Sequence, residues 1–141
     1  MSKFYVVYPE CPAGFEGVEW DTSFVPPRPA SAHLLFDAPL FSDLVTSHAG
    51  VYAVTLALAD DLAATELTGF AFVPLTGELS SYVEAGREFE IPALRALVIT
   101  SPALAADFGL KGRKRLVLSQ RAVDFLTTRD PVFGKYVMDV L

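Results

Sequence analysis

Short runs of apolar and β-branched residues alternate along this chain with segments in which apolar residues recur at helical spacing. A run bounded by glycine, proline or small polar residues is typical of a β-strand. The predicted strands cover residues 3–8, 33–36, 51–54, 70–74, 94–100, 116–118 and 136–141. The run Leu97-Val98-Ile99 is apolar throughout, so we expect the strand that contains it to be buried.

Helical spacing predicts three helices, each with a capping residue near its start. They cover residues 39–47, with Asp37 as the N-cap, residues 56–66, capped by Thr55, and residues 120–128, capped by Ser119. Residues 102–108 are long enough for one or two further helical turns. Residues 78–92 are acidic and show no clear period.

Two segments that cross from a predicted strand into a predicted helix resemble each other. Val54–Leu62 aligns without gaps on Leu118–Leu126, with a Ser or Thr cap, an aspartate and a leucine at equivalent positions. Strands that run into capped amphipathic helices tend to use these residues in any case. The similarity therefore indicates at most an internal pseudo-repeat.

The 141 residues are 52% hydrophobic and 20% charged, which is enough apolar material for a substantial core. This predicts a single α+β domain over residues 1–141, with a mixed β-sheet of about five to seven strands and two or three amphipathic helices packed on it. Uncharged stretches such as Ala49–Ala59 are shorter than the roughly 20 residues of a membrane span, and the N-terminus lacks the features of a signal peptide. We therefore expect a cytoplasmic protein without a membrane partner.

Residues 10–29 are predicted to form a proline-rich arm or ordered loop. Four prolines lie from Pro12 to Pro29, with large apolar residues among them. These apolar residues either lie across the domain or are presented to a partner. The first arrangement is favoured, because exposed apolar clusters are uncommon on monomers.

The charges are unevenly distributed along the chain. The net charge is −6, and residues 1–70 carry −7 while residues 71–141 carry +1. An acidic half argues against a broad phosphate-binding surface. It favours either a basic partner or simple solubility.

Residue types that carry out catalysis or hold metals are sparse. The two histidines, His33 and His48, are isolated, and a single cysteine, Cys11, excludes an internal disulfide. No spacing matches a metal site, no nucleophile motif is present, and neighbours such as Asp60 and Asp61 are typical of a solvated helix face. The sequence thus predicts a non-enzymatic protein with no metal and no cofactor.

The basic cluster at residues 111–115 is the feature that most favours nucleic acid. It holds Lys111, Arg113, Lys114 and Arg115 and no acidic residue, so phosphate contacts are a third hypothesis. No aromatic residues are interleaved with these bases, and stacking on single strands therefore has no support. A charged turn between strands accounts for the cluster better.

Three parts of the chain carry a resemblance to a known family. They are Leu67-Thr68-Gly69-Phe70 with Phe72-Val73-Pro74, then Asp107-Phe108-Gly109-Leu110, and Arg115-Leu116-Val117-Leu118-Ser119-Gln120-Arg121-Ala122. The chain resembles small bacterial α+β immunity proteins of polymorphic or contact-dependent toxin systems, over roughly residues 36–126. The resemblance implies a stoichiometric binder that neutralises a toxin in the cytoplasm of its producer. It carries no catalytic residue across, and the arm lies outside it.

We therefore expect a protein-binding module of the immunity type, whose partner is a cognate toxin or another protein with a basic surface. The expected partner-binding residues are aromatic anchors and a charged rim within the arm, namely Phe15, Trp20 and Phe24, and Glu16, Glu19 and Asp21. The alternative is a small-ligand-binding protein or an enzyme with a pocket near His33 or His48.

Overall fold

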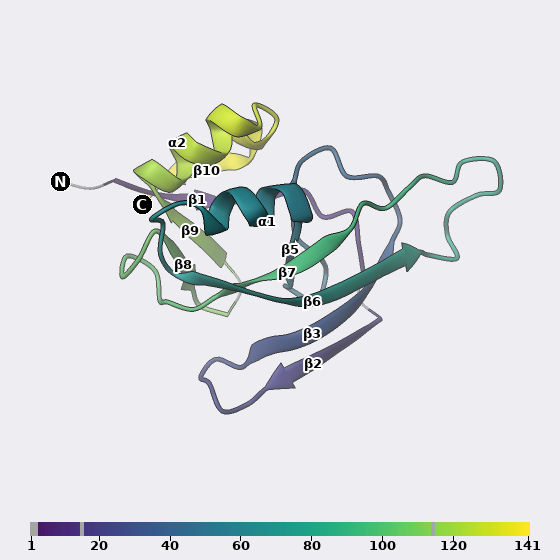
Figure 1. Ribbon diagram of the computed structural model, residues 1–141, viewed down its shortest axis with the longest axis horizontal. Helices are drawn as coiled ribbons and strands as arrows, with labels where there is room; N and C mark the ends of the chain where they lie inside the picture. The colour runs from purple at the N-terminus through teal and green to yellow at the C-terminus, as the bar shows by residue number, and fades with distance from the viewer. Residues whose placement is uncertain (1–2, 15, 114) are drawn as a thin grey trace.

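Two β-sheets with two α-helices make up the architecture of the chain (Figure 1). The computed structural model describes residues 3–14, 16–113 and 115–141. Within them lie ten strands, so the predicted α+β class is confirmed. No helix among these residues is long and apolar enough to cross a membrane.

The larger sheet is mixed and has six strands, as the predicted range allows. In spatial order its strands are β2 (Gly17–Asp21), β3 (Arg28–Phe36), β6 (Phe70–Leu79), β7 (Leu94–Ile99), β5 (Tyr52–Thr55) and β4 (Leu44–Val45). Only β3 and β6 run parallel, and every other pair is antiparallel.

The smaller sheet has four antiparallel strands, and the sequence pattern did not separate it from the larger one. In order these strands are β10 (Val137–Val140), β1 (Phe4–Val7), β9 (Arg115–Ser119) and β8 (Phe108–Lys111). The two ends of the chain therefore pair with each other. A short 3₁₀ helix, η1 (Phe133–Tyr136), leads into β10.

Both α-helices begin where a strand ends, and they lie together on one side of the molecule (Figure 1). Helix α1 (Leu56–Ala63) is capped by Thr55, whose side chain accepts from the Leu58 amide. Helix α2 (Gln120–Arg129) is capped by Ser119, whose side chain accepts from the Ala122 amide. The two predicted caps are confirmed, and each satisfies an amide that the helix leaves without a partner.

The apolar interior has two parts. The first lies beneath both helices and joins the two sheets, with Leu62, Leu126, Leu116 and Phe108 among its most buried members. The second lies on the other face of the large sheet, where alternate residues of β3 and β7 meet. Gly77 allows this contact, since a Cβ there would lie 2.6 Å from the ring of buried Phe36.

The predicted helix at residues 39–47 is wrong. The segment is irregular and contains the short strand β4. Its amides are bound by distant carboxylates, because a Glu10 oxygen accepts from Phe41 and Ser42 (2.7 Å each) and Asp130 accepts from Asp43 (3.1 Å). These bonds replace the hydrogen bonds of a helix, and His48 accordingly lies outside any helix.

The predicted turns of helix at residues 102–108 are also wrong. The Ala103 amide donates to the Leu110 carbonyl (2.9 Å), and the Leu110 amide donates to the Ser101 carbonyl (3.0 Å). The start of the segment therefore lies alongside β8 and does not form a helix. Residues 108–111, which the pattern assigned to helical turns and to a basic loop, form the strand β8. The basic cluster is the β8–β9 hairpin, and Lys114 lies outside the described residues.

Residues 10–29 contain the strand β2 and the first two residues of β3, and the remaining described residues of this range are loop and turn. These strands form a hairpin at the edge of the large sheet. The hairpin is attached to β6 only from the pair Ala32 and Leu75 onward, immediately after Pro74. Proline has no amide to donate to a neighbouring strand, and the pairing of β3 with β6 accordingly begins after Pro74.

Candidate functional site

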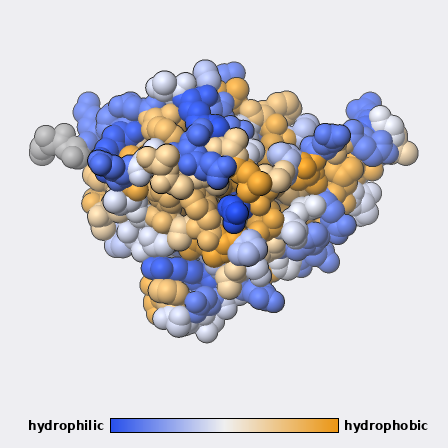
Figure 2. All heavy atoms as spheres, viewed as in Figure 1, coloured by the Kyte–Doolittle hydropathy of each residue, from blue (hydrophilic) through white to orange (hydrophobic). Residues whose placement is uncertain are grey.

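The β2–β3 hairpin carries the residues that the sequence predicted for partner binding. Glu16 precedes β2, Glu19, Trp20 and Asp21 lie on it, and Phe24 lies in the turn that follows. The remaining predicted residue, Phe15, lies outside the described residues. At the lower edge of Figure 2, where Figure 1 places this turn, hydrophobic and hydrophilic residues mix on a protruding lobe.

The apolar residues of the hairpin divide between the interior and the surface. Val18 packs against the second core, as the favoured arrangement of the arm requires. In contrast, Trp20 is 47% exposed, Phe24 39% and Val25 98%. The outer part of the hairpin therefore presents aromatic and aliphatic surface. The exposed carboxylate of Glu19 lies next to it on β2, and that of Glu16 lies at the other end of β2, where the Glu16 amide donates to the His33 carbonyl.

Asp21 is engaged within the hairpin. Its Oδ1 accepts hydrogen bonds from the Ser23 amide (3.0 Å) and the Ser23 hydroxyl (2.5 Å). These bonds lower the pKa of the Asp21 carboxyl, and the positive charge of Arg28 adds to the effect. Asp21 thus orders the turn, which leaves Glu16 and Glu19 as the exposed acids of the hairpin.

The outer part of the hairpin and the β5 and β7 region of the same sheet enclose a groove of about 780 Å³. It is lined by residues 25–29, 49–52 and 97–102, with Trp20, Thr22, Leu110 and Arg113. Most of these side chains are apolar. Burial raises the pKa of Tyr52 to about 12, so this lining residue keeps its phenol proton at neutral pH.

Arg28 joins the two walls of the groove. Its Nη2 donates to the Thr100 carbonyl (3.0 Å), and its guanidinium lies 3.8 Å from the centre of the Phe24 ring. A cation over an aromatic face is attracted by the ring's electrons. The two contacts fix the guanidinium between the hairpin and the end of β7.

Neither histidine lines this groove. His33 lies on the outer face of β3 and β6, where its ring nitrogens meet the Thr76 hydroxyl (2.6 Å) and a Glu78 oxygen (3.0 Å). His48 is exposed in the turn before β5. The groove nevertheless reaches the neighbour of His48 in sequence, because Ala49 lines it.

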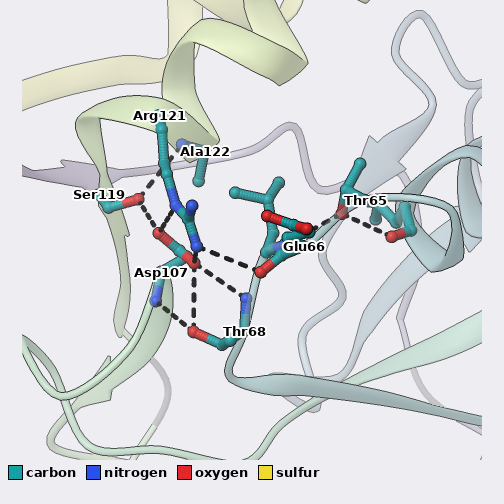
Figure 3. Close-up of polar contacts among 9 residues, drawn as sticks. Thr65, Glu66, Thr68, Asp107, Ser119, Arg121 and Ala122 are labelled. Atoms are coloured by element: carbon teal, nitrogen blue, oxygen red, sulfur yellow. Dashed lines mark hydrogen bonds and ion pairs between the residues drawn. The ribbon is translucent and has the colours of Figure 1, made fainter.

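Asp107 is the centre of a hydrogen-bonded network (Figure 3). One oxygen accepts from Ser119 Oγ (2.7 Å) and Arg121 Nε (2.8 Å). The other accepts from Arg121 Nη2 (2.7 Å) and from the amide and hydroxyl of Thr68 (2.9 and 3.1 Å). Arg121 also donates to the Glu66 carbonyl (3.1 Å), so the network ties α2 to the segments that precede β6 and β8.

This network has a structural role, because both Asp107 oxygens and the hydroxyls of Ser119 and Thr68 are bonded within it. Ser119 donates to Asp107 while it caps α2, and Arg121 holds the pKa of the Asp107 carboxyl well below its usual range, against the effect of burial. The three sequence segments on which the expected resemblance was based supply Thr68, Asp107, Ser119 and Arg121. In the folded chain, these segments meet at the Asp107 network, which connects the two sheets and α2.

Metal-binding side chains, the cysteine and the basic hairpin were the remaining candidates. Within residues 3–14, 16–113 and 115–141, no three metal-binding side chains are grouped. Cys11 is an exposed thiol that donates to the Ala13 carbonyl (3.6 Å). The exposed cations of the β8–β9 hairpin are Lys111, Arg113 and Arg115, the last of which lies 5.9 Å from the Tyr8 ring.

Comparison with known proteins gives no relatives for this chain: no family model, no curated protein and no solved structure matches it. The residues of the chain therefore carry the functional argument by themselves.

Proposed function

We propose that the protein is a non-enzymatic protein-binding module of the immunity type, which neutralises a cognate toxin by docking the outer part of the β2–β3 hairpin on a basic surface. The observation that supports the proposal is the grouping of Glu16, Glu19, Trp20 and Phe24 on one projecting edge hairpin. Aromatic residues surrounded by charge are the usual centre and rim of a protein interface.

The charges support a basic partner. Exposed carboxylates attract a positive surface over several ångströms and raise the rate of encounter. Lys3 and Arg28 are the only basic residues among positions 1–70, so little of the negative charge of this half is compensated locally. We expect mutations of the acids to act on the association rate and mutations of Trp20 to act on dissociation.

The test compares two variants with the same change in net charge. E16K/E19K reverses the exposed acids of the hairpin, and D60K/E90K reverses two exposed acids elsewhere. Tagged wild type and both variants are used to capture proteins from a lysate of the source organism at moderate salt. A stoichiometric partner that the wild type and D60K/E90K retain and E16K/E19K loses is the expected result.

The captured partner is then expressed with and without the wild type. Arrest of growth by the partner, relieved by the wild type and by D60K/E90K but not by E16K/E19K, is expected of an immunity protein. A partner retained equally by the two variants, or one whose toxicity the protein does not relieve, contradicts the proposal. Circular dichroism of each variant checks that the fold is kept.

A further inference from the structure

We propose that the groove beside the hairpin binds a hydrophobic carboxylate, with an apolar chain lying in the groove and the carboxylate held by Arg28 and Arg113. Fatty acids and related amphipathic anions are the chemical class. This inference goes beyond the protein-binding function proposed above and does not depend on it.

The size and lining of the groove suit an apolar chain. Its volume of about 780 Å³ lies within the range of small-molecule sites, which are roughly 300–1,000 Å³. Val51, Val98 and Ile99 form its floor and are largely buried, whereas Trp20 and Val25 of the hairpin contribute exposed apolar surface. Such surface gains free energy when an apolar ligand displaces water from it.

Arg28 supplies the polar end of the site. Its side chain is half-buried against the groove, and no carboxylate of the described residues lies within ion-pair distance. Asp21 pairs with Arg28 in the hairpin register, but its Oδ1 is bound to Ser23, and its charge acts on Arg28 without a close ion pair. A half-buried guanidinium without a close ion pair favours a ligand that brings a carboxylate into contact with it.

The guanidinium is also ready to bind. Of the five N–H donors of Arg28, one is used on the Thr100 carbonyl (3.0 Å) among the described residues, and the Phe24 ring holds the plane of the group. Arg113 lines the same groove from the β8–β9 hairpin and makes no ion pair with a described residue. Guanidinium groups match carboxylates with paired hydrogen bonds.

Trp20 provides the measurement, because it is the only tryptophan of the chain and it lines the groove. Its fluorescence is followed while octanoate, decanoate and dodecanoate are added below their micelle-forming concentrations. A saturable change is expected, with a dissociation constant that falls by up to about fourfold for each added methylene, as full burial of the chain requires. Decanol, which has the same chain without the charge, is expected to bind at least about tenfold more weakly than decanoate.

Substitutions of the two arginines test the contribution of the ligand's carboxylate separately from that of its alkyl chain. Arg113→Gln and Arg28→Gln are each expected to weaken decanoate binding several-fold and to leave decanol binding nearly unchanged. Arg113 is exposed in a turn, so its replacement keeps the fold even where that of Arg28 disturbs the hairpin. Arg87→Gln, an exposed substitution far from the groove residues in sequence, is the matched control and is expected to bind as the wild type does.

Several outcomes overturn the proposal. They are the absence of a saturable response to all three carboxylates, equal affinity for decanol and decanoate, and decanoate binding that Arg113→Gln and Arg28→Gln leave unchanged. A response to phosphatidylglycerol vesicles without a response to free carboxylates would assign the site to a lipid headgroup at a membrane and would equally refute it.

Discussion

Replacement of Asp107 by asparagine is the most direct test of what holds the two sheets and α2 together. The side chain of Asp107 is 8% exposed and accepts hydrogen bonds from Arg121, Ser119 and Thr68. Asparagine has nearly the same shape, but one of its two terminal atoms is an NH₂ group. In either orientation of the amide, that group faces donors that the carboxylate had bound.

The cost follows from the number of bonds and their exposure. A hydrogen bond to a charged group contributes about 1.5–3 kcal/mol, and a donor left facing a donor in a buried place adds to the loss. Arg121 is 58% exposed and turns to water when its partner is lost, which reduces the penalty. We expect D107N to lower the free energy of unfolding by about 3 kcal/mol, or the melting temperature by roughly 10 °C for a domain of this length.

The effect also depends on pH. Because the pKa of Asp107 is lower in the folded protein than in the unfolded chain, its stabilisation is fully present at neutral pH. It is lost progressively as the pH falls below about 4, where the carboxyl of the unfolded chain begins to take up a proton. The stability difference between wild type and D107N should therefore narrow between pH 6 and pH 3.

Urea unfolding followed by circular dichroism at 222 nm measures both effects. D60N is the matched control, because Asp60 is exposed on α1 and its replacement makes the same chemical change. We expect D60N to stay within about 0.5 kcal/mol of the wild type. A loss for D107N no greater than that of D60N, or a difference that does not shrink in acid, would refute the reasoning.

Two further predictions concern stability and use the same assay. Gly77→Ala places a Cβ 2.6 Å from the Phe36 ring and should cost about 1–3 kcal/mol, whereas Gly17→Ala meets nothing within 4 Å and should cost far less. Thr55→Ala removes a helix cap and should cost about 1 kcal/mol. Ser119→Ala should cost about twice as much because Ser119 also donates to Asp107, and equal costs for the two caps would contradict this account.

The parts of the fold that sequence predicted well are those in which local signals agree with packing. Both helices with a Ser or Thr cap at the end of a strand were found, with Thr55 and Ser119 in the predicted roles. The predicted helix at residues 39–47 failed because its amides are bound by Glu10 and Asp130, which are far away in sequence. No local pattern reports a partner at such a distance.

The residues of the candidate site could be predicted from the sequence, but the hairpin and the groove that they form could not. Composition indicated that residues 10–29 hold aromatic and acidic side chains, and the structure places those it describes on one hairpin. The groove was missed, because it is built from segments around positions 25, 50, 100 and 113 that meet only in the folded chain. Pro74 pairs with Arg95 of β7 on one side only, and the pairing of β6 with β3 on the other side begins at Leu75.

Among the described residues, exposed large hydrophobic side chains are grouped on the hairpin more than elsewhere. The other exposed large hydrophobic residues, such as Phe41, Tyr82 and Leu104, are spread along the chain, whereas Trp20, Phe24 and Val25 are grouped. Sites at which a folded chain departs from local consistency are where function is expected. A partner on the outer side of the hairpin and an anion at Arg28 on its inner side would each supply what the folded chain lacks there.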